Sequence, residues 1–287
     1  MRRFLEGVFA PVLLFGIVYV GVFVVALFLP VESQAGFHSV GLAAAFIASW
    51  VAIRGYDGGR WSLGFGGGLT NAIRELLLGA GLASVLLLIS HSLILVTTGF
   101  RHSEGIGIDW MQILLLFLPA AVHEEVLLRG YPFQKLIAWH RTAGVVIGSL
   151  VFGLLHLSNG GLTTLSIVNL FLAGIMLSLA YLVYERLWLP IGLHVWWNVL
   201  SGPLLGHEVS GLDLESTLLE AHDPGPVLLT GGAFGIEGSI WTSVVEAFGI
   251  FFLLWVLHRR NRMHLPPAQT GITETGETAG LHRMENE

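Results

Sequence analysis

Two adjacent carboxylates interrupt an apolar part of this sequence. Glu124 and Glu125 directly follow residues 111–122, which are almost entirely apolar. Glu125 and Arg129 are four residues apart, so on a helix they share a face and can form an ion pair. Glu124 points about 100° away from them and keeps no counter-charge. A free carboxylate in an apolar cavity suits a general base acting on water. The alternative is purely structural, with one Glu–Arg pair and a second glutamate facing a water-filled crevice.

Histidines occur in two later apolar segments. His156 follows Phe152 by four residues, near the end of one segment, and His194 precedes Asn198 by the same spacing in another. His194 and Asn198 therefore share a helix face, where they can hold a metal ion or donate hydrogen bonds to an oxyanion. Each histidine can equally be a hydrogen-bonding group between packed helices. The pair His123-Glu124 does not begin an HExxH zinc motif, because position 127 is leucine.

These residues need membrane helices to position them. Apolar segments long enough to span or nearly span a bilayer occur at 8–29, 38–53, 72–97, 110–128, 143–157, 163–184, 187–201 and 239–258. The fourth is expected to continue to about residue 139, with a kink at Pro132. At 1.5 Å per residue, Glu124, His156, His194 and Asn198 all fall near the bilayer midplane or slightly to its cytoplasmic side. Three separate polar signals at one depth favour a single site.

Charge places the segments across the membrane. With a cytoplasmic N-terminus, all 14 Lys and Arg residues except Arg101 fall on the cytoplasmic side, as the positive-inside rule requires. We therefore predict an all-α polytopic bundle of about eight transmembrane helices, residues 1–262, with both termini cytoplasmic and a catalytic core at 110–202. Residues 263–287 are polar, without apolar periodicity, and are expected to form a disordered cytoplasmic tail. Residues 202–238 are expected to form a loop or lid, with a short helix near 215–220.

Composition excludes several classes of protein. The 287 residues are 54% hydrophobic and 12% charged, and the mean hydropathy of +0.73 indicates an integral, multi-pass membrane protein rather than a soluble one. The chain has no cysteine, which excludes disulfides, thiol nucleophiles and Cys-ligated metals. Neither an internal repeat nor a broken helix pair supports a transporter that carries protons on Glu124. Nothing suggests nucleic-acid binding.

The ordered motifs resemble a known family. Glu124-Glu125-x-x-x-Arg129, Phe152-x-x-x-His156 and His194-x-x-x-Asn198 resemble, in order and spacing, the three signatures of the CPBP family. This family, also called Abi, includes the CAAX prenyl endopeptidases, among them the Ras-converting enzyme, and the bacteriocin-processing enzymes. The resemblance covers about residues 110–202. Each motif alone is common, but the set on consecutive membrane helices is specific.

The resemblance implies an intramembrane endopeptidase that cuts near the cytoplasmic side of a prokaryotic plasma membrane. Glu124 would activate the water, His156 would hold it, and His194 with Asn198 would stabilise the oxyanion. Supporting roles fall to Glu125, Arg129 and Phe152. Two mechanisms stay open, a zinc enzyme with His156 and His194 as metal ligands and a metal-free glutamic peptidase. The substrate would be a peptide or protein, lipidated or plain, with a CAAX-like, other C-terminal or membrane-proximal cleavage site.

A second interpretation is a non-proteolytic bacteriocin-immunity or membrane-binding protein that keeps the polar cluster for structure. Several polar residues of the spans stay unassigned. Glu246 can pair across the bundle or face a cavity. His91 and Asn169 are expected to be packing groups, and Trp196 and Trp197 are expected to line the cavity wall. The sequence predicts neither the natural substrate nor the oligomeric state.

Overall fold

The computed structural model describes residues 4–26, 28, 33–222 and 225–263. It confirms the all-α bundle, with helical structure at each of the eight predicted segments. The N-terminal pair is α2 (Ala10–Ala26), which continues a π-helical turn at Leu5–Phe9, and α3 (Gln34–Val51). The central helices are α4 (Gly68–Thr97), α8 (Arg141–Leu155), α9 (Thr164–Tyr184) and α10 (Trp188–Val199). The last is α12 (Ile240–Met263), so most of the predicted tail lies outside the described residues.

Six helical stretches are long and apolar enough to cross a membrane, and the chain is a multi-pass membrane protein. They are Leu5–Ala26, Gln34–Tyr56, Gly68–Thr97, Trp110–Trp139, Thr164–Tyr184 and Ile240–Arg260. α8 is apolar but shorter, and α10 reaches a comparable length only with the π-helical turn Leu200–Leu204. Large apolar side chains such as Val25, Leu77 and Phe251 point outward, as expected for surfaces that face lipid. The predicted number of crossings stays a prediction.

The fourth predicted span is broken rather than kinked. It consists of α5 (Trp110–Gln112), a π-helical turn at Ile113–Phe117, α6 (Leu118–Arg129) and α7 (Tyr131–Trp139). The predicted continuation to residue 139 is confirmed, but the interruption lies at Gly130 and not at Pro132. Pro132 stands in the first turn of α7, where its missing N–H costs nothing. A Cβ on Gly130 would lie 2.1 Å from the Val126 carbonyl oxygen, so glycine allows the break.

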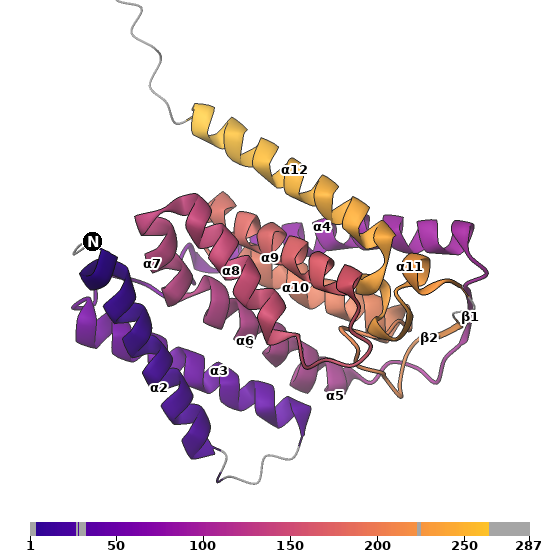
Figure 1. Ribbon diagram of the computed structural model, residues 1–287, viewed down its shortest axis with the longest axis horizontal. Helices are drawn as coiled ribbons and strands as arrows, with labels where there is room; N and C mark the ends of the chain where they lie inside the picture. Colours follow the sequence, from indigo (N-terminus) through magenta and orange to yellow (C-terminus); the bar gives the residue numbers. More distant parts are fainter. Residues whose placement is uncertain (1–3, 27, 29–32, 223–224, 264–287) are drawn as a thin grey trace, which may run out of the picture.

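Small residues bring the central helices close together. A Cβ on Gly192 of α10 would lie 2.3 Å from the Leu76 carbonyl of α4, and one on Gly79 would lie 2.4 Å from the Leu189 carbonyl. α2 and α3 pack together and α3 packs on α6, whereas α12 packs on α9 and α4 at the opposite side of the bundle (Figure 1). The α6, α8 and α10 helices that carry the three motifs are therefore enclosed on both sides.

Two strands join the ends of distant segments. β1 (Arg101–Glu104) pairs antiparallel with β2 (Leu219–His222), and α11 (Val227–Thr230) follows them along the chain. The short helix expected near 215–220 is therefore wrong, because the backbone there pairs with a strand instead. Figure 1 places these elements at one end of the bundle and places the start of α2 and the end of α12 at the other end.

Candidate active site

Glu125 is the anchor of the site. It lies on α6 and is completely buried, and its Oε1 accepts a hydrogen bond from Arg129 Nη1 at 3.0 Å. Arg129 is equally buried, donates from Nη2 to the Gly174 carbonyl of α9 and lies 4.8 Å from the centre of the Phe152 ring. The predicted i, i+4 pair is confirmed, and it ties α6 to α8 and α9. A buried ion pair that holds its geometry in this way is better suited to positioning than to stability.

His194 is oriented by Glu125. Its Nδ1 donates to Glu125 Oε1 at 2.9 Å, across an interface between α10 and α6. A carboxylate oxygen can only accept, so this bond engages the Nδ1–H and leaves Nε2 to face Glu124. The free Nε2 lies 3.9 Å from Glu124 Oε2. Arg129, Glu125 and His194 therefore form one chain of contacts that ends at Glu124.

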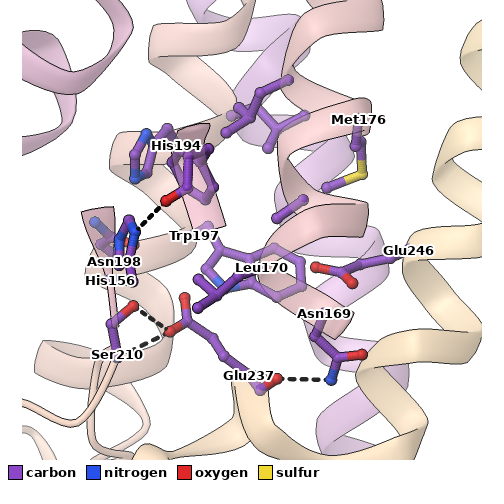
Figure 2. Close-up of a pocket in the computed structure, with 14 residues that line it drawn as sticks. His156, Asn169, Leu170, Met176, His194, Trp197, Asn198, Ser210, Glu237 and Glu246 are labelled. Carbon is purple, nitrogen blue, oxygen red and sulfur yellow. Dashed lines mark hydrogen bonds between the residues drawn. The ribbon is translucent and has the colours of Figure 1, made fainter. Parts of the chain in front are cut away.

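His156 is oriented by a hydrogen bond to a backbone carbonyl. It stands just after the end of α8, and its Nδ1 donates to the Phe152 carbonyl at 2.8 Å (Figure 2). Its Nε2 lies 3.8 Å from Glu124 Oε2. The predicted supporting residue Phe152 thus contributes a carbonyl to His156 and a ring to Arg129.

Glu124 faces both histidines without a bond to either. Its Oε2 is buried and lacks a hydrogen-bond partner in the described part of the chain. The two separations of 3.8 and 3.9 Å are too long for direct hydrogen bonds. All three groups line one cavity, and polar groups at such separations can be bridged by water. The structure therefore brings Glu124, His156 and His194 together, and Asn198, four residues after His194, lines the same cavity.

The site opens into a cavity of about 500 Å³. Besides the motif residues, its wall includes Tyr19 of α2 and His38 of α3, which sequence reasoning did not select. The Tyr19 hydroxyl lies 2.9 Å from His123 Nε2, and His38 Nδ1 lies 3.4 Å from His123 Nδ1. Polar side chains within otherwise apolar spans were the available signal for both. The N-terminal helix pair therefore completes a site whose motifs lie in later helices.

A second cavity, of about 40 Å³, lies behind the same residues. His156, His194 and Asn198 line both cavities. Glu246 was expected either to pair across the bundle or to face a cavity. The structure supports the cavity, because the side chain lines it and is 2% exposed. Trp197 also lines it, as expected, but Trp196 instead donates to the Ser84 hydroxyl.

The segment after α10 covers the end of the cavities near β1 and β2. Ser210 lines both cavities and has a left-handed backbone with φ of 49°. Its N–H and hydroxyl both donate to Glu237 Oε2, at 2.8 and 2.6 Å (Figure 2), and its carbonyl accepts from the Asn159 amide. These bonds hold a conformation that is costly for a residue with a Cβ. The predicted loop at 202–238 is thus a tightly bonded cover.

Histidines join that cover to α4. His91 Nδ1 lies 2.9 Å from His207 Nε2, and His91 Nε2 lies 3.2 Å from His102 Nε2. Burial, together with the nearby His91 and His102, lowers the pKa of His207 to about 3. The ring is therefore neutral near pH 7. His91 and Asn169 both act as packing groups here, since Asn169 donates to the Glu237 and Ser239 carbonyls.

The predicted metal ligands do not form a complete metal site in this geometry. Among the described residues, no group of three His, Asp or Glu side chains has the spacing that a metal ion requires. Donor atoms about 2.1 Å from a shared tetrahedral zinc lie closer together than the His–Glu separations found here. The zinc assignment to His156 and His194 stays a prediction.

The chain matches one family model across the site. Residues 106–200 match the family described as type II CAAX prenyl endopeptidase Rce1-like. No match was found among curated proteins or among solved structures. The matched residues contain all three motifs and α6, α8 and α10, and the match confirms the resemblance inferred from those motifs. Over residues 106–200, the chain is therefore similar to the Rce1-like type II CAAX prenyl endopeptidases.

Proposed function

We propose that this protein is a metal-free intramembrane endopeptidase in which Glu124 activates the hydrolytic water. The observation that carries the proposal is the convergence of His156 Nε2 and His194 Nε2, at 3.8 and 3.9 Å, on one unpartnered oxygen of Glu124. The family match supports peptide hydrolysis as the reaction. The cavity of about 500 Å³ has room for an extended peptide segment beside these groups.

The reaction proceeds in two steps. Glu124 removes a proton from the water held between it and the two histidines, and the water oxygen attacks the carbonyl carbon of the scissile bond. Asn198 donates to the resulting oxyanion, and protonated His194 adds an Nε2–H donor and a positive charge that the Glu125 carboxylate stabilises from the other side of the ring. The tetrahedral intermediate then collapses, the C–N bond breaks, and Glu124 passes its proton to the leaving amine.

The site lies within the predicted membrane spans, so the substrate has to reach bilayer depth. We propose a peptide substrate cleaved near the cytoplasmic side, at a CAAX-like, other C-terminal or membrane-proximal position. A lipid attached to the substrate would be accommodated by the apolar surfaces around the bundle. Lipidated and plain peptides of the same sequence distinguish these cases.

The purified protein is tested with that peptide panel. Glu124→Gln and His194→Ala are expected to lower kcat by about 10²- to 10⁴-fold, the usual contribution of a positioned base. Glu215→Gln, on an exposed part of the cover, is the matched control and should retain activity. Wild-type activity in both site variants would contradict the proposal.

Two further measurements distinguish the proposed mechanism from a zinc mechanism and from a structural role of the cluster. Activity that a chelator removes and zinc restores would replace the metal-free mechanism with a zinc mechanism. If the wild-type protein cleaves no peptide, and if Glu124→Gln and His194→Ala lower the melting temperature, the cluster is structural. That outcome would favour the non-proteolytic immunity or binding protein.

A further inference from the structure

Glu246 presents a buried carboxylate to the 40 Å³ cavity and has no role in the proposed hydrolysis. It extends from α12, and Figure 2 shows its carboxylate directed towards Trp197 and Leu170. The side chain is 2% exposed, and its Oε2 finds no hydrogen-bond partner within the described ranges. An unpaired carboxylate at this depth is costly, which makes it a candidate binding group rather than a packing group.

The rest of the cavity wall determines what such a group can bind. Phe152, Leu170, Met176, Leu177 and Trp197 form an apolar wall. Glu237 contributes a second carboxylate, whose Oε2 accepts from Ser210, and neither Lys nor Arg is among the described residues that line the cavity. His156 and His194 are the basic side chains of the described wall, so a buried carboxylate that pairs with neither favours a ligand that brings positive charge and hydrogen-bond donors. An apolar wall favours a ligand whose charge lies at the end of an aliphatic chain.

The volume of the cavity limits which ligands fit. A volume of about 40 Å³ corresponds to roughly three water molecules, since one needs about 10–15 Å³. An ammonium group with its last methylenes is compact enough, whereas the planar guanidinium of arginine is broader. His156, His194 and Asn198 line both cavities, so the smaller cavity lies beside a peptide held in the larger one.

We infer that the small cavity is a specificity pocket for a lysine side chain of the substrate, with Glu246 as its binding carboxylate. This inference rests on the proposed peptidase function and adds a substrate class to it. The lysine lies beside the scissile bond, because the pocket shares three residues with the catalytic site. The aliphatic part of the lysine contacts the apolar wall, and its ammonium donates to Glu246.

The cleavage test uses peptides that carry lysine, arginine or norleucine at each position next to the scissile bond. At one position, the wild-type kcat/KM for lysine should exceed that for norleucine by about 10- to 100-fold, the effect of a hydrogen bond to a charged group. Arginine should be poorer than lysine. Glu246→Gln should reduce the lysine-to-norleucine ratio at least tenfold, whereas Glu215→Gln should preserve it. A ratio that is near one, or that Glu246→Gln leaves unchanged, would overturn the pocket but not the peptidase.

A binding test needs no cleavage and applies even if the proposed peptidase function fails. The melting temperature of the detergent-solubilised protein is measured with n-butylammonium and with 1-butanol, a neutral molecule of the same chain length. The ammonium should stabilise the wild-type protein more than the alcohol, and Glu246→Gln should abolish the difference. Equal shifts with both probes would show that the cavity holds only water or apolar groups, which would overturn the inference. The melting temperature without a probe shows whether the variant is folded.

Discussion

Glu124 and Glu125 are neighbours in the sequence but differ in their surroundings. Glu125 receives hydrogen bonds from Arg129 and His194, whereas Glu124 Oε2 receives none from the described residues. The difference follows from the angle of about 100° between successive residues on a helix. One carboxylate can therefore hold the site while the adjacent one acts on water.

Glu125→Gln tests this division of roles. The amide keeps the size of the side chain but removes the negative charge that faces the His194 Nδ1–H. We expect kcat to fall about 10- to 100-fold, as for other groups that orient a catalytic histidine, with little change in KM. A purely structural role would predict a lower melting temperature with kcat preserved in the folded fraction. Glu125→Asp keeps the charge and should recover part of the activity.

Contacts within one helix were predictable from the sequence, and contacts between distant helices were not. The Glu125–Arg129 pair was predictable because both residues lie on one helix, and its 3.0 Å contact confirms it. The His194–Glu125 bond was not, because 69 residues separate the partners and only the packing of α10 on α6 joins them. The same applies to His38 and Tyr19, whose place in the site depends on the folded position of α2 and α3.

At the scale of elements, α10 depends on α4 for its position. α10 carries His194 and Asn198, and Gly79 and Gly192 allow the two backbones to approach closely. Hydropathy predicted both helices, because apolar runs identify membrane segments independently of their partners. It did not predict the break at Gly130 or the strand at Leu219–His222, since each depends on a local backbone geometry or on a distant partner.

Gly79→Ala and Gly81→Ala form a matched pair on α4. A Cβ at position 79 would lie 2.4 Å from the Leu189 carbonyl, whereas one at position 81 would have no neighbour within 4 Å. Gly79→Ala should therefore separate α4 from α10, destabilise the protein by about 1–3 kcal/mol and lower kcat. Gly81→Ala should be neutral or slightly stabilising. Thermal melting and peptide cleavage measure both effects, and equal behaviour of the two variants would disprove the role of close packing.

In the whole molecule, the distribution of charged residues and the arrangement of the helices indicate the same orientation in the membrane. The start of α2 and the end of α12 lie at one end of the bundle (Figure 1). Buried or partly buried ion pairs, Lys135–Asp57 and Arg186–Glu75, lie in segments that charge assigned to the cytoplasmic side. The opposite end carries the β1–β2 pair and the cover that contains Ser210. The start of α2 and the end of α12 thus lie on the same side, and the positive-inside rule predicts that this side is cytoplasmic.

The absence of cysteine from the sequence allows a direct test of this orientation. Glu215 in the cover and Thr142 at the start of α8 are both exposed, so a single cysteine at either position is accessible to a membrane-impermeant maleimide. Glu215→Cys should be labelled in intact cells, and Thr142→Cys only after lysis, with the wild-type chain as the unlabelled control. The reverse pattern would mean that the molecule has the opposite orientation. Labelling of both positions in intact cells would mean that the chain crosses the membrane an even number of times between residues 142 and 215. In that case one of the shorter helices, α8 or α10, would not span the bilayer.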